Sequence, residues 1–284
     1  LNPRERVGDL LNALEANRSL RLKFYAALAV IVVAGTAGAW LYPGWREDNA
    51  VDMARQWLEA GRLDRAEEAV QEALAEAPQR VEAWQLAADY ARRAGLKRAA
   101  ATYARHAASL DPSNPGLTLD WAALALAAGQ TDNAATALGQ VPSSVRDGSA
   151  RAHRLAGELA RRRGDLAAAR TDFEAALRLE GPLPINEVPL GLVLADAPPG
   201  ADRRHGMALL AKWQGDPVWG VEALRGLLAH ALADNDRAAM LRWAGALRAD
   251  PAHEQADELN ALLALAQADE RRFALALDED EKAA

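Results

Sequence analysis

Cysteine is absent from this 284-residue sequence. The chain therefore has no disulfide bonds, no thiolate ligands for a metal and no thiol nucleophile. This absence does not identify the cellular compartment, because an array of packed helices needs no covalent cross-link.

Aromatic residues are scarce, at 5% of the sequence, although half of all residues are hydrophobic. Alanine and leucine supply much of that hydrophobic content, and both favour helix more strongly than the β-branched residues do. The composition therefore predicts an all-α fold.

An excess of basic residues is also missing, since the formal net charge is −7 and the isoelectric point is near 5.4. Proteins that bind nucleic acid usually present a basic face to the phosphate backbone. Nucleic acid is therefore not an expected partner.

The sequence shows no pattern typical of a catalytic or cofactor site. No glycine-rich phosphate loop follows a predicted strand, and no pair of histidines has the spacing of a metal motif. The five histidines fall in separate helices or turns, namely His106, His153, His205, His230 and His253. We therefore expect no enzyme activity, no cofactor and no bound metal.

One long hydrophobic run, residues 24–42, contains 19 residues without a formal charge. As a helix it would span about 28 Å, close to the roughly 30 Å hydrocarbon core of a bilayer. Phe24 begins the run, and Trp40, Tyr42 and Trp45 cluster at its far end, as aromatic residues do at membrane interfaces. We expect residues 23–43 to form a transmembrane helix.

Charge asymmetry gives this expected helix an orientation. Residues 1–23 carry five basic and three acidic side chains, so the positive-inside rule places the N-terminus in the cytoplasm. The protein would then lie in a bacterial inner membrane with the rest of the chain in the periplasm. Two alternatives are a cleaved signal peptide, suggested by Ala37-Gly38-Ala39, and a buried helix of a soluble protein.

Residues 1–22 form the expected cytoplasmic segment. Its apolar residues recur at the i, i+3, i+4 and i+7 spacing of a short amphipathic helix, at Val7, Leu10, Leu11 and Leu14. A helix on the membrane surface and a poorly ordered tail are both compatible with this stripe.

Residues 81–114 read as two amphipathic helices separated at Gly95 and stopped at Pro112. Small or aromatic residues mark fixed positions within this stretch, at Trp84, Ala88 and Ala100. The same register recurs along the chain and predicts six helix pairs, at 47–80, 81–114, 115–148, 150–183, 186–219 and 220–253. The proline-rich fifth pair is divergent and should form an irregular step. A capping helix and an acidic tail are expected at 254–284.

These residues resemble the tetratricopeptide repeat family over about residues 47–253. The resemblance implies a solenoid in which each helix pair covers the apolar face of the next. It also implies a concave groove lined by the first helix of each pair.

The groove positions implied by the resemblance begin charged, pass a basic band and end apolar. They are Gln85, Asp89, Arg92, Leu119, Leu126, Arg151, Arg154, Arg161, Leu190, Leu194, Leu224 and Leu228. The Lys and Asn residues that clamp a terminal carboxylate in one variant of the family have no counterpart here. We expect the groove to bind an apolar segment with an acidic flank. Alternatively, Leu190, Leu194, Leu224 and Leu228 are covered by neighbouring helices.

The sequence thus predicts a single-pass, membrane-anchored scaffold that binds other proteins on the periplasmic side. One alternative is an accessory subunit of a membrane complex, whose span packs through a small-residue face that includes Gly35 and Gly38. Others are a translocon-associated, chaperone-like factor, and an enzyme with a catalytic domain outside these residues.

Overall fold

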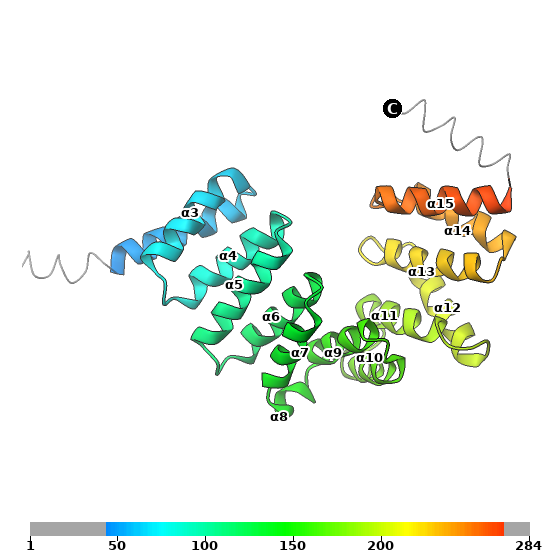
Figure 1. Ribbon diagram of the computed structural model, residues 1–284, viewed down its shortest axis with the longest axis horizontal. Helices are drawn as coiled ribbons and strands as arrows, with labels where there is room; N and C mark the ends of the chain where they lie inside the picture. Colours follow the sequence, from blue (N-terminus) through cyan, green and yellow to red (C-terminus); the bar gives the residue numbers. More distant parts are fainter. Residues whose placement is uncertain (1–43, 270–284) are drawn as a thin grey trace, which may run out of the picture. The chain divides into compact units, whose positions relative to one another are not determined.

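The computed structural model describes residues 44–269, and the expected cytoplasmic segment and transmembrane helix lie outside them. The chain divides into two compact units, Leu1–Leu96 and Lys97–Ala284, of which residues 44–96 and 97–269 are described. Among the helices within the described residues, none is both long and apolar enough to cross a bilayer. Each unit is considered by itself below (Figure 1).

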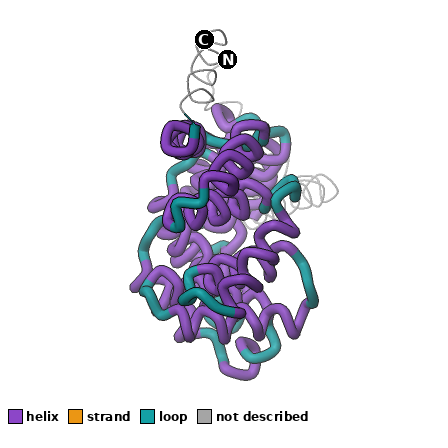
Figure 2. Tube along the Cα trace, turned by 90° about the vertical axis from the view of Figure 1, so that its right-hand side faces the viewer, coloured by secondary structure: helices purple, strands orange, loops and turns teal. Residues whose placement is uncertain are grey.

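Residues 44–269 contain helices and turns and no strand (Figure 2), which confirms the all-α prediction for this part of the chain. In the first unit, residues 44–59 are helical and are followed by α3 (Leu63–Glu76) and α4 (Val81–Arg93). The second unit begins with α5 (Lys97–Leu110), α6 (Pro115–Ala127), α7 (Thr131–Gln140) and α8 (Ser143–Arg146). It continues with α9 (Ala150–Arg162), α10 (Leu166–Glu180), α11 (Pro184–Ala195), α12 (Ala201–Trp213), α13 (Gly220–Ala233), α14 (Arg237–Ala249) and α15 (Gln255–Ala268).

Successive helices in the second unit pack as antiparallel neighbours, for example α6 on α7, α9 on α10 and α11 on α12. Alternate helices also contact one another, so that α6, α9, α11, α13 and α15 form a continuous row. This arrangement is a stack of helix pairs, in which each pair buries the face that the preceding pair leaves open.

The turn between paired helices uses a left-handed residue at a recurring position. Gly61, Gly95, Gly129 and Gly164 have φ values of 69°, 74°, 72° and 79°. Glycine adopts this conformation without the steric penalty of a Cβ. Asn235, with φ of 54°, is in the same place between α13 and α14, where asparagine is the next best choice.

Small buried residues recur at an equivalent position near the start of the second helices. These are Ala66, Ala100, Ala134 and Ala169, each 0% exposed. Their short side chains allow the helix backbones to approach closely. Larger residues such as Phe173, 1% exposed, fill the remaining space.

The divergent pair α11/α12 departs from this scheme. A Cβ placed on Gly206 would lie 2.5 Å from the Ala195 nitrogen and 2.6 Å from the Gly191 carbonyl oxygen, so the two backbones are in direct contact. α11 begins at Pro184, not at the expected residue 186, because proline suits the first helical turn. Gly200, expected in the inter-helix turn, directly precedes α12 with an extended φ of 175°.

The row of helices ends in a core shared by α11 to α15. Its fully buried residues include Val188, Leu210, Leu224, Met240 and Leu247. α15 is joined to α13 by Arg225, whose Nε and Nη2 donate to the two carboxylate oxygens of Asp257 at 2.6 and 2.7 Å. The predicted capping helix is therefore attached to the array by a bidentate ion pair as well as by apolar contacts.

Further ion pairs connect neighbouring helix pairs at a separation of 31 or 32 residues. They join Asp48 to Arg80, Asp120 to Arg151, Asp132 to Arg163, Arg170 to Asp202, and Arg203 to Asp234. Apart from Asp48–Arg80, both within residues 47–80, each links one helix pair to the next.

Candidate protein-binding site

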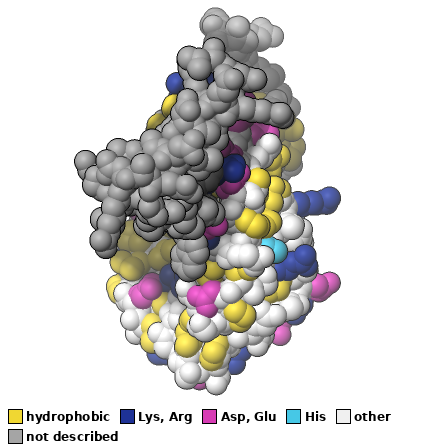
Figure 3. Space-filling view, turned by 90° about the vertical axis from the view of Figure 1, so that its left-hand side faces the viewer, with side chains coloured by type: hydrophobic (Ala, Val, Ile, Leu, Met, Phe, Trp, Pro, Cys, Tyr) yellow, Lys and Arg dark blue, Asp and Glu magenta, His cyan; other side chains and the backbone are white. Residues whose placement is uncertain are grey.

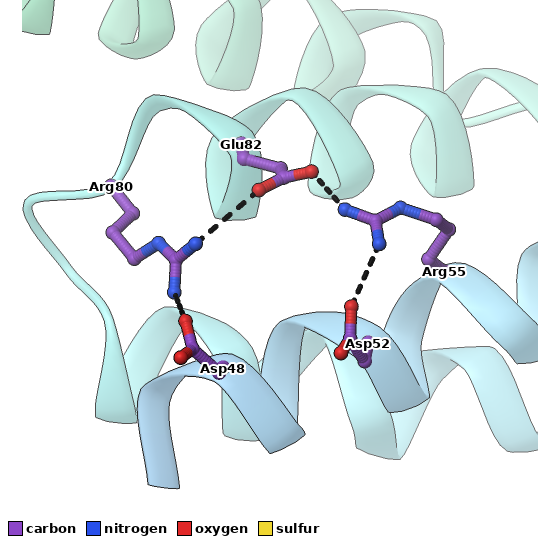
Figure 4. Close-up of polar contacts among 5 residues, drawn as sticks. All are labelled: Asp48, Asp52, Arg55, Arg80 and Glu82. Atoms are coloured by element: carbon purple, nitrogen blue, oxygen red, sulfur yellow. Dashed lines mark hydrogen bonds and ion pairs between the residues drawn. The ribbon is translucent and has the colours of Figure 1, made fainter. Parts of the chain in front are cut away.

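Charged side chains of the first unit pair with one another around the start of α4. Arg55 contacts Asp52 and Glu82, while Arg80 contacts Glu82 and Asp48 (Figure 4). This network joins the helix at 44–59 to the start of α4. Because its members are substantially exposed, it contributes little to stability.

Further along α4, Asp89 pairs with Arg92 and Arg93, and Gln85 is exposed. Burial raises the pKa of the Asp89 carboxyl, but hydrogen bonds from the two arginines outweigh burial and leave the pKa below its ordinary value. The Asp89 carboxylate therefore forms its ion pairs with arginines of its own helix.

The six predicted groove leucines are buried, not exposed. Their exposed fractions are 5% or less, at Leu119, Leu126, Leu190, Leu194, Leu224 and Leu228. Leu190 and Leu194 belong to the core between α10, α11 and α12, and Leu224 and Leu228 to the core of α11 to α15. Burial supports the alternative stated above, in which neighbouring helices cover these side chains. The prediction of an apolar groove surface at these leucines is wrong.

The three predicted arginines, Arg151, Arg154 and Arg161, line one cavity of about 490 Å³. We call it the arginine pocket. Its other lining residues are Leu155, Glu158, Arg162, Phe173, Ile185, Pro189, Leu192, Trp219 and Glu222. The basic band of the prediction and an apolar surface therefore do meet, but the apolar residues are not the predicted leucines.

Helix α9 supplies half of the pocket. It is capped by Ser149, whose Oγ accepts a hydrogen bond from the Ala152 N–H at 3.2 Å. From Arg151 to Arg162 its pocket residues recur at i, i+3, i+4, i+7, i+10 and i+11, which places them on one face of the helix. The opposite face buries Ala152 and Leu159.

The apolar part of the pocket comes from α10, α11 and the turn before α13. The ring of Phe173 lies directly on α9, since a Cβ on Gly157 would meet three ring atoms at 2.9 to 3.0 Å. Ile185, Pro189 and Leu192 recur at i, i+4 and i+7 along α11 and form a wall. Trp219 adds an aromatic surface.

At the N-terminal end of α9, the pocket arginines are paired with carboxylates of neighbouring helices. Arg151 donates to Asp120 of α6 at 2.5 Å. Arg154 donates to Glu180, and also to Asn186 Oδ1 at 3.0 Å. These bonds connect α9 to the helix pairs on either side of it.

At the other end of α9, Glu158 accepts from Arg161 Nε at 2.9 Å and from Arg162 Nε at 2.6 Å. Burial lowers the pKa of Arg161, but the hydrogen bonds and charge of Glu158 reverse that effect and raise the pKa above its ordinary value. Arg162 also donates to the Leu126 carbonyl at 2.7 Å, at the end of α6. Both guanidinium groups are therefore held in place at the pocket rim.

Basic, acidic and hydrophobic side chains are intermixed on the surface that Figure 3 draws in colour. Within residues 44–269, no group of three or more His, Cys, Asp or Glu side chains could hold a metal ion. His153 Nδ1 lies 2.9 Å from Asp172 Oδ1, and this contact joins α9 to α10. The arginine pocket combines a cavity with charged and apolar side chains.

The predicted membrane residues Phe24, Trp40 and Tyr42 lie outside the described residues. Trp45 is 61% exposed in the helix at 44–59. The sequence prediction missed the α11 wall, although the spacing of Ile185, Pro189 and Leu192 was visible in the sequence. Trp219 had no comparable signal, because a turn positions it.

The sequence matches no protein-family model and no curated protein. Its fold is similar to several solved structures. PilF of Pseudomonas aeruginosa aligns with a TM-score of 0.57 at 18% identity, over 79% of this chain and 99% of that one. PilW, a type IV pilus biogenesis factor, aligns with a TM-score of 0.60 at 14% identity, over 75% and 97%. A tetratricopeptide repeat protein from Parabacteroides merdae aligns with a TM-score of 0.62 at 16% identity, over 84% and 93%.

Proposed function

From the tetratricopeptide-repeat fold that the chain shares with these structures, we propose that the protein is a non-catalytic scaffold that binds other proteins. The arginine pocket carries this proposal, because it places an apolar cavity next to fixed hydrogen-bond donors. Its volume of about 490 Å³ falls within the range of ligand-binding sites. A rigid stack of helix pairs suits such a role, since it offers a preformed surface to an extended or helical segment.

The proposed scaffold is anchored in a membrane. Residues 24–42 carry no formal charge and could span a bilayer. The excess of basic residues before them supports a cytoplasmic N-terminus, with the array in the periplasm of a bacterial cell. A pilus biogenesis factor among the similar structures is consistent with a role in assembling envelope proteins, although fold similarity does not transfer function.

Site-directed photo-crosslinking of the full chain in its native membrane tests the scaffold role. A photoreactive residue at Trp219 should give adducts with a defined set of proteins, and these adducts should disappear when Arg151→Glu and Arg161→Glu are added. The matched control position is Arg105, an exposed residue of α5 outside the pocket lining. The scaffold proposal fails if Trp219 and Arg105 give the same adducts.

The absence of native cysteine makes the topology directly measurable. Single cysteines can be introduced by Ser19→Cys, before the expected span, and by Ser113→Cys, within the array. A thiol reagent that crosses the outer but not the inner membrane should label position 113 in intact cells and position 19 only after lysis. Labelling of both positions, or of neither, in intact cells would exclude the proposed orientation.

A further inference from the structure

Pro189 lies inside α11 and in the wall of the arginine pocket. Proline has no backbone N–H, so the carbonyl group of Ile185, four residues earlier, lacks the donor that a regular α-helix would supply. The proline ring also crowds that carbonyl group and distorts the helix around it. Because Ile185 and Pro189 both line the pocket, the α11 wall presents a main-chain hydrogen-bond acceptor to a ligand in the cavity.

The α9 side of the pocket presents hydrogen-bond donors. Glu158 accepts from both Arg161 and Arg162, so one carboxylate there serves two guanidinium groups. The hydrogen bonds given for the described residues use two of the five N–H groups on each of these arginines. The two side chains are 34% and 36% exposed, so a ligand carboxylate can reach them. The lining as a whole holds four guanidinium groups and two carboxylates, Glu158 and Glu222, which favours an acidic ligand.

The rest of the lining is apolar and includes Leu155, Phe173, Leu192 and Trp219. A complementary ligand therefore carries a large apolar group, a carboxylate for the arginines and an N–H for the Ile185 carbonyl. An extended polypeptide offers all three within a few residues, because its main-chain N–H groups recur at every residue, about 3.3 Å apart. A fatty acid has an apolar chain and a carboxylate but no N–H donor.

We propose that the Ile185 carbonyl, which Pro189 leaves without its helical donor, binds a main-chain N–H of an extended segment of a partner protein. A large apolar residue of this segment fills the pocket interior, and a neighbouring Asp or Glu binds Arg161 and Arg162. Pro189 is then a specificity-determining residue, because it makes the acceptor available. The inference rests on the proposed function and deepens it, since it gives the chemistry of the partner segment.

Selection from a display library of random nine-residue peptides, flanked by glycine-serine linkers, tests this chemistry on the full chain in lipid nanodiscs. The enriched peptides should combine a large apolar residue with a nearby Asp or Glu. Their enrichment should fall by about tenfold on Arg161→Gln, which removes one rim charge. Arg105→Gln makes the same change on α5, outside the pocket lining, and should leave enrichment within about twofold. Circular dichroism checks that the helices of each variant are intact.

The Ile185 acceptor is tested with one enriched peptide in which each main-chain N–H is replaced in turn by N-methyl. At one position this change should weaken binding to the unaltered chain by about fivefold. The same change should have less than about a twofold effect on Pro189→Val, whose N–H pairs with the Ile185 carbonyl while an apolar side chain stays in the wall. Leu192→Val is the matched control, because it alters the wall without adding an N–H and should keep the full N-methyl effect.

Three outcomes would overturn the inference. These are enriched peptides that lack an apolar and acidic pair, enrichment that Arg161→Gln leaves unchanged, and equal N-methyl effects on the unaltered chain and on Pro189→Val. Binding of dodecanoate without enrichment of any peptide would also overturn it, since the ligand would then be a simple amphiphile. None of these results depends on the crosslinking at Trp219, so the proposed function can stand when this inference fails.

Discussion

Two neighbouring helix pairs, α9/α10 and α11/α12, use glycine for different purposes. In α9/α10, Gly157 makes room for the ring of Phe173, so a side chain fills the space between the helices. In α11/α12, Gly206 faces Gly191 and the end of α11, so the backbones touch and no side chain separates them. The first contact can adjust when a ring tilts, whereas the second has no flexible group that can yield.

The polar contact within α9/α10 is also more exposed than the carboxylate that joins α11 to α12. His153 of α9 and Asp172 of α10 are partly exposed, with side-chain exposures of 18% and 27%. In α11/α12, Glu187 is 6% exposed and accepts hydrogen bonds from Lys212 at 2.5 Å and from the Trp213 indole N–H at 2.6 Å. The divergent pair is thus the more tightly constrained of the two, and its α11 forms one wall of the arginine pocket.

The largest effect should come from Gly206→Ala. The added methyl group would overlap backbone atoms of α11 at 2.5 to 2.8 Å, which should lower the free energy of unfolding by about 3 kcal/mol. Gly139→Ala on α7 is the matched control, because its Cβ would meet nothing within 4 Å and alanine favours helix by up to about 1 kcal/mol. Denaturant unfolding followed by circular dichroism measures both variants. Equal stabilities would show that the backbones of α11 and α12 are not in contact.

Ion pairs between helices of different pairs also differ in burial, and the carboxylate of Asp257 is a buried example. Asp257, 1% exposed, accepts from Arg225 and from the Glu254 N–H at 2.8 Å. Asp257→Asn should lower the free energy of unfolding by about 2 kcal/mol, because charge-assisted hydrogen bonds are lost. Asp234→Asn is the control, since its carboxylate is 52% exposed in a similar pair with Arg203. A loss at Asp234 as large as that at Asp257 would contradict the role of burial.

The same carboxylate predicts a pH dependence. The hydrogen bonds from Arg225 are the main cause of a pKa of Asp257 below its ordinary value, and they outweigh burial. Since the pKa is lower in the folded than in the unfolded protein, this stabilisation is fully present above the unfolded pKa of about 4. It is lost as the pH falls from about 4 through the folded pKa. The difference in stability between the unaltered chain and Asp257→Asn should shrink over that window in pH-dependent melts.

Gly157→Ala should have a smaller effect than Gly206→Ala. The new Cβ would meet the Phe173 ring at 2.9 to 3.0 Å, and the ring can move at a cost of about 1–2 kcal/mol. Because Phe173 lines the arginine pocket, this variant should also reduce the crosslinking from Trp219. A destabilisation equal to that of Gly206→Ala would remove the distinction between a side-chain contact and a backbone contact.

The smallest effect should come from Glu82→Gln in the charge network of the first unit. Glu82 and Arg55 have side-chain exposures of 42% and 38%, so the change should lower stability by less than about 0.5 kcal/mol. The loss should decrease further in 0.5 M salt, where exposed charges are screened. A loss of more than about 1 kcal/mol in the free energy of unfolding that does not change with salt would contradict this, because it would show that the exposed network stabilises the fold as strongly as a buried ion pair does.

The sequence predicted those features that depend on local periodicity. Helix pairs recur because Gly61, Gly95, Gly129 and Gly164 occupy left-handed turns about one repeat apart, and glycine marks such turns in sequence. The basic band at Arg151, Arg154 and Arg161 was predicted from the resemblance to the tetratricopeptide repeat family, and the three arginines share one face of α9.

Features that depend on the packing between helix pairs could not be predicted from local periodicity. Leu190 and Leu224 were assigned to an open groove, but Leu190 is buried in the core between α10, α11 and α12, and Leu224 in the core of α11 to α15. Pro189 was interpreted only as a disruption of its helix, and it became part of the pocket wall. The same burial of Leu119, Leu126 and Leu228 shows that the error concerns the first helices of several pairs and not the divergent pair alone.

The ion pairs between successive helix pairs involve the fourth repeat on both of its sides. Residues 150–183 contribute Arg151, Arg163 and Arg170, which pair with acidic residues in both the preceding and the following repeat. Excising this repeat would leave Asp120, Asp132 and Asp202 without these arginines. Removal of the fourth repeat would therefore break ion pairs with both of its neighbours, and each of these exposed pairs contributes about 0–1 kcal/mol.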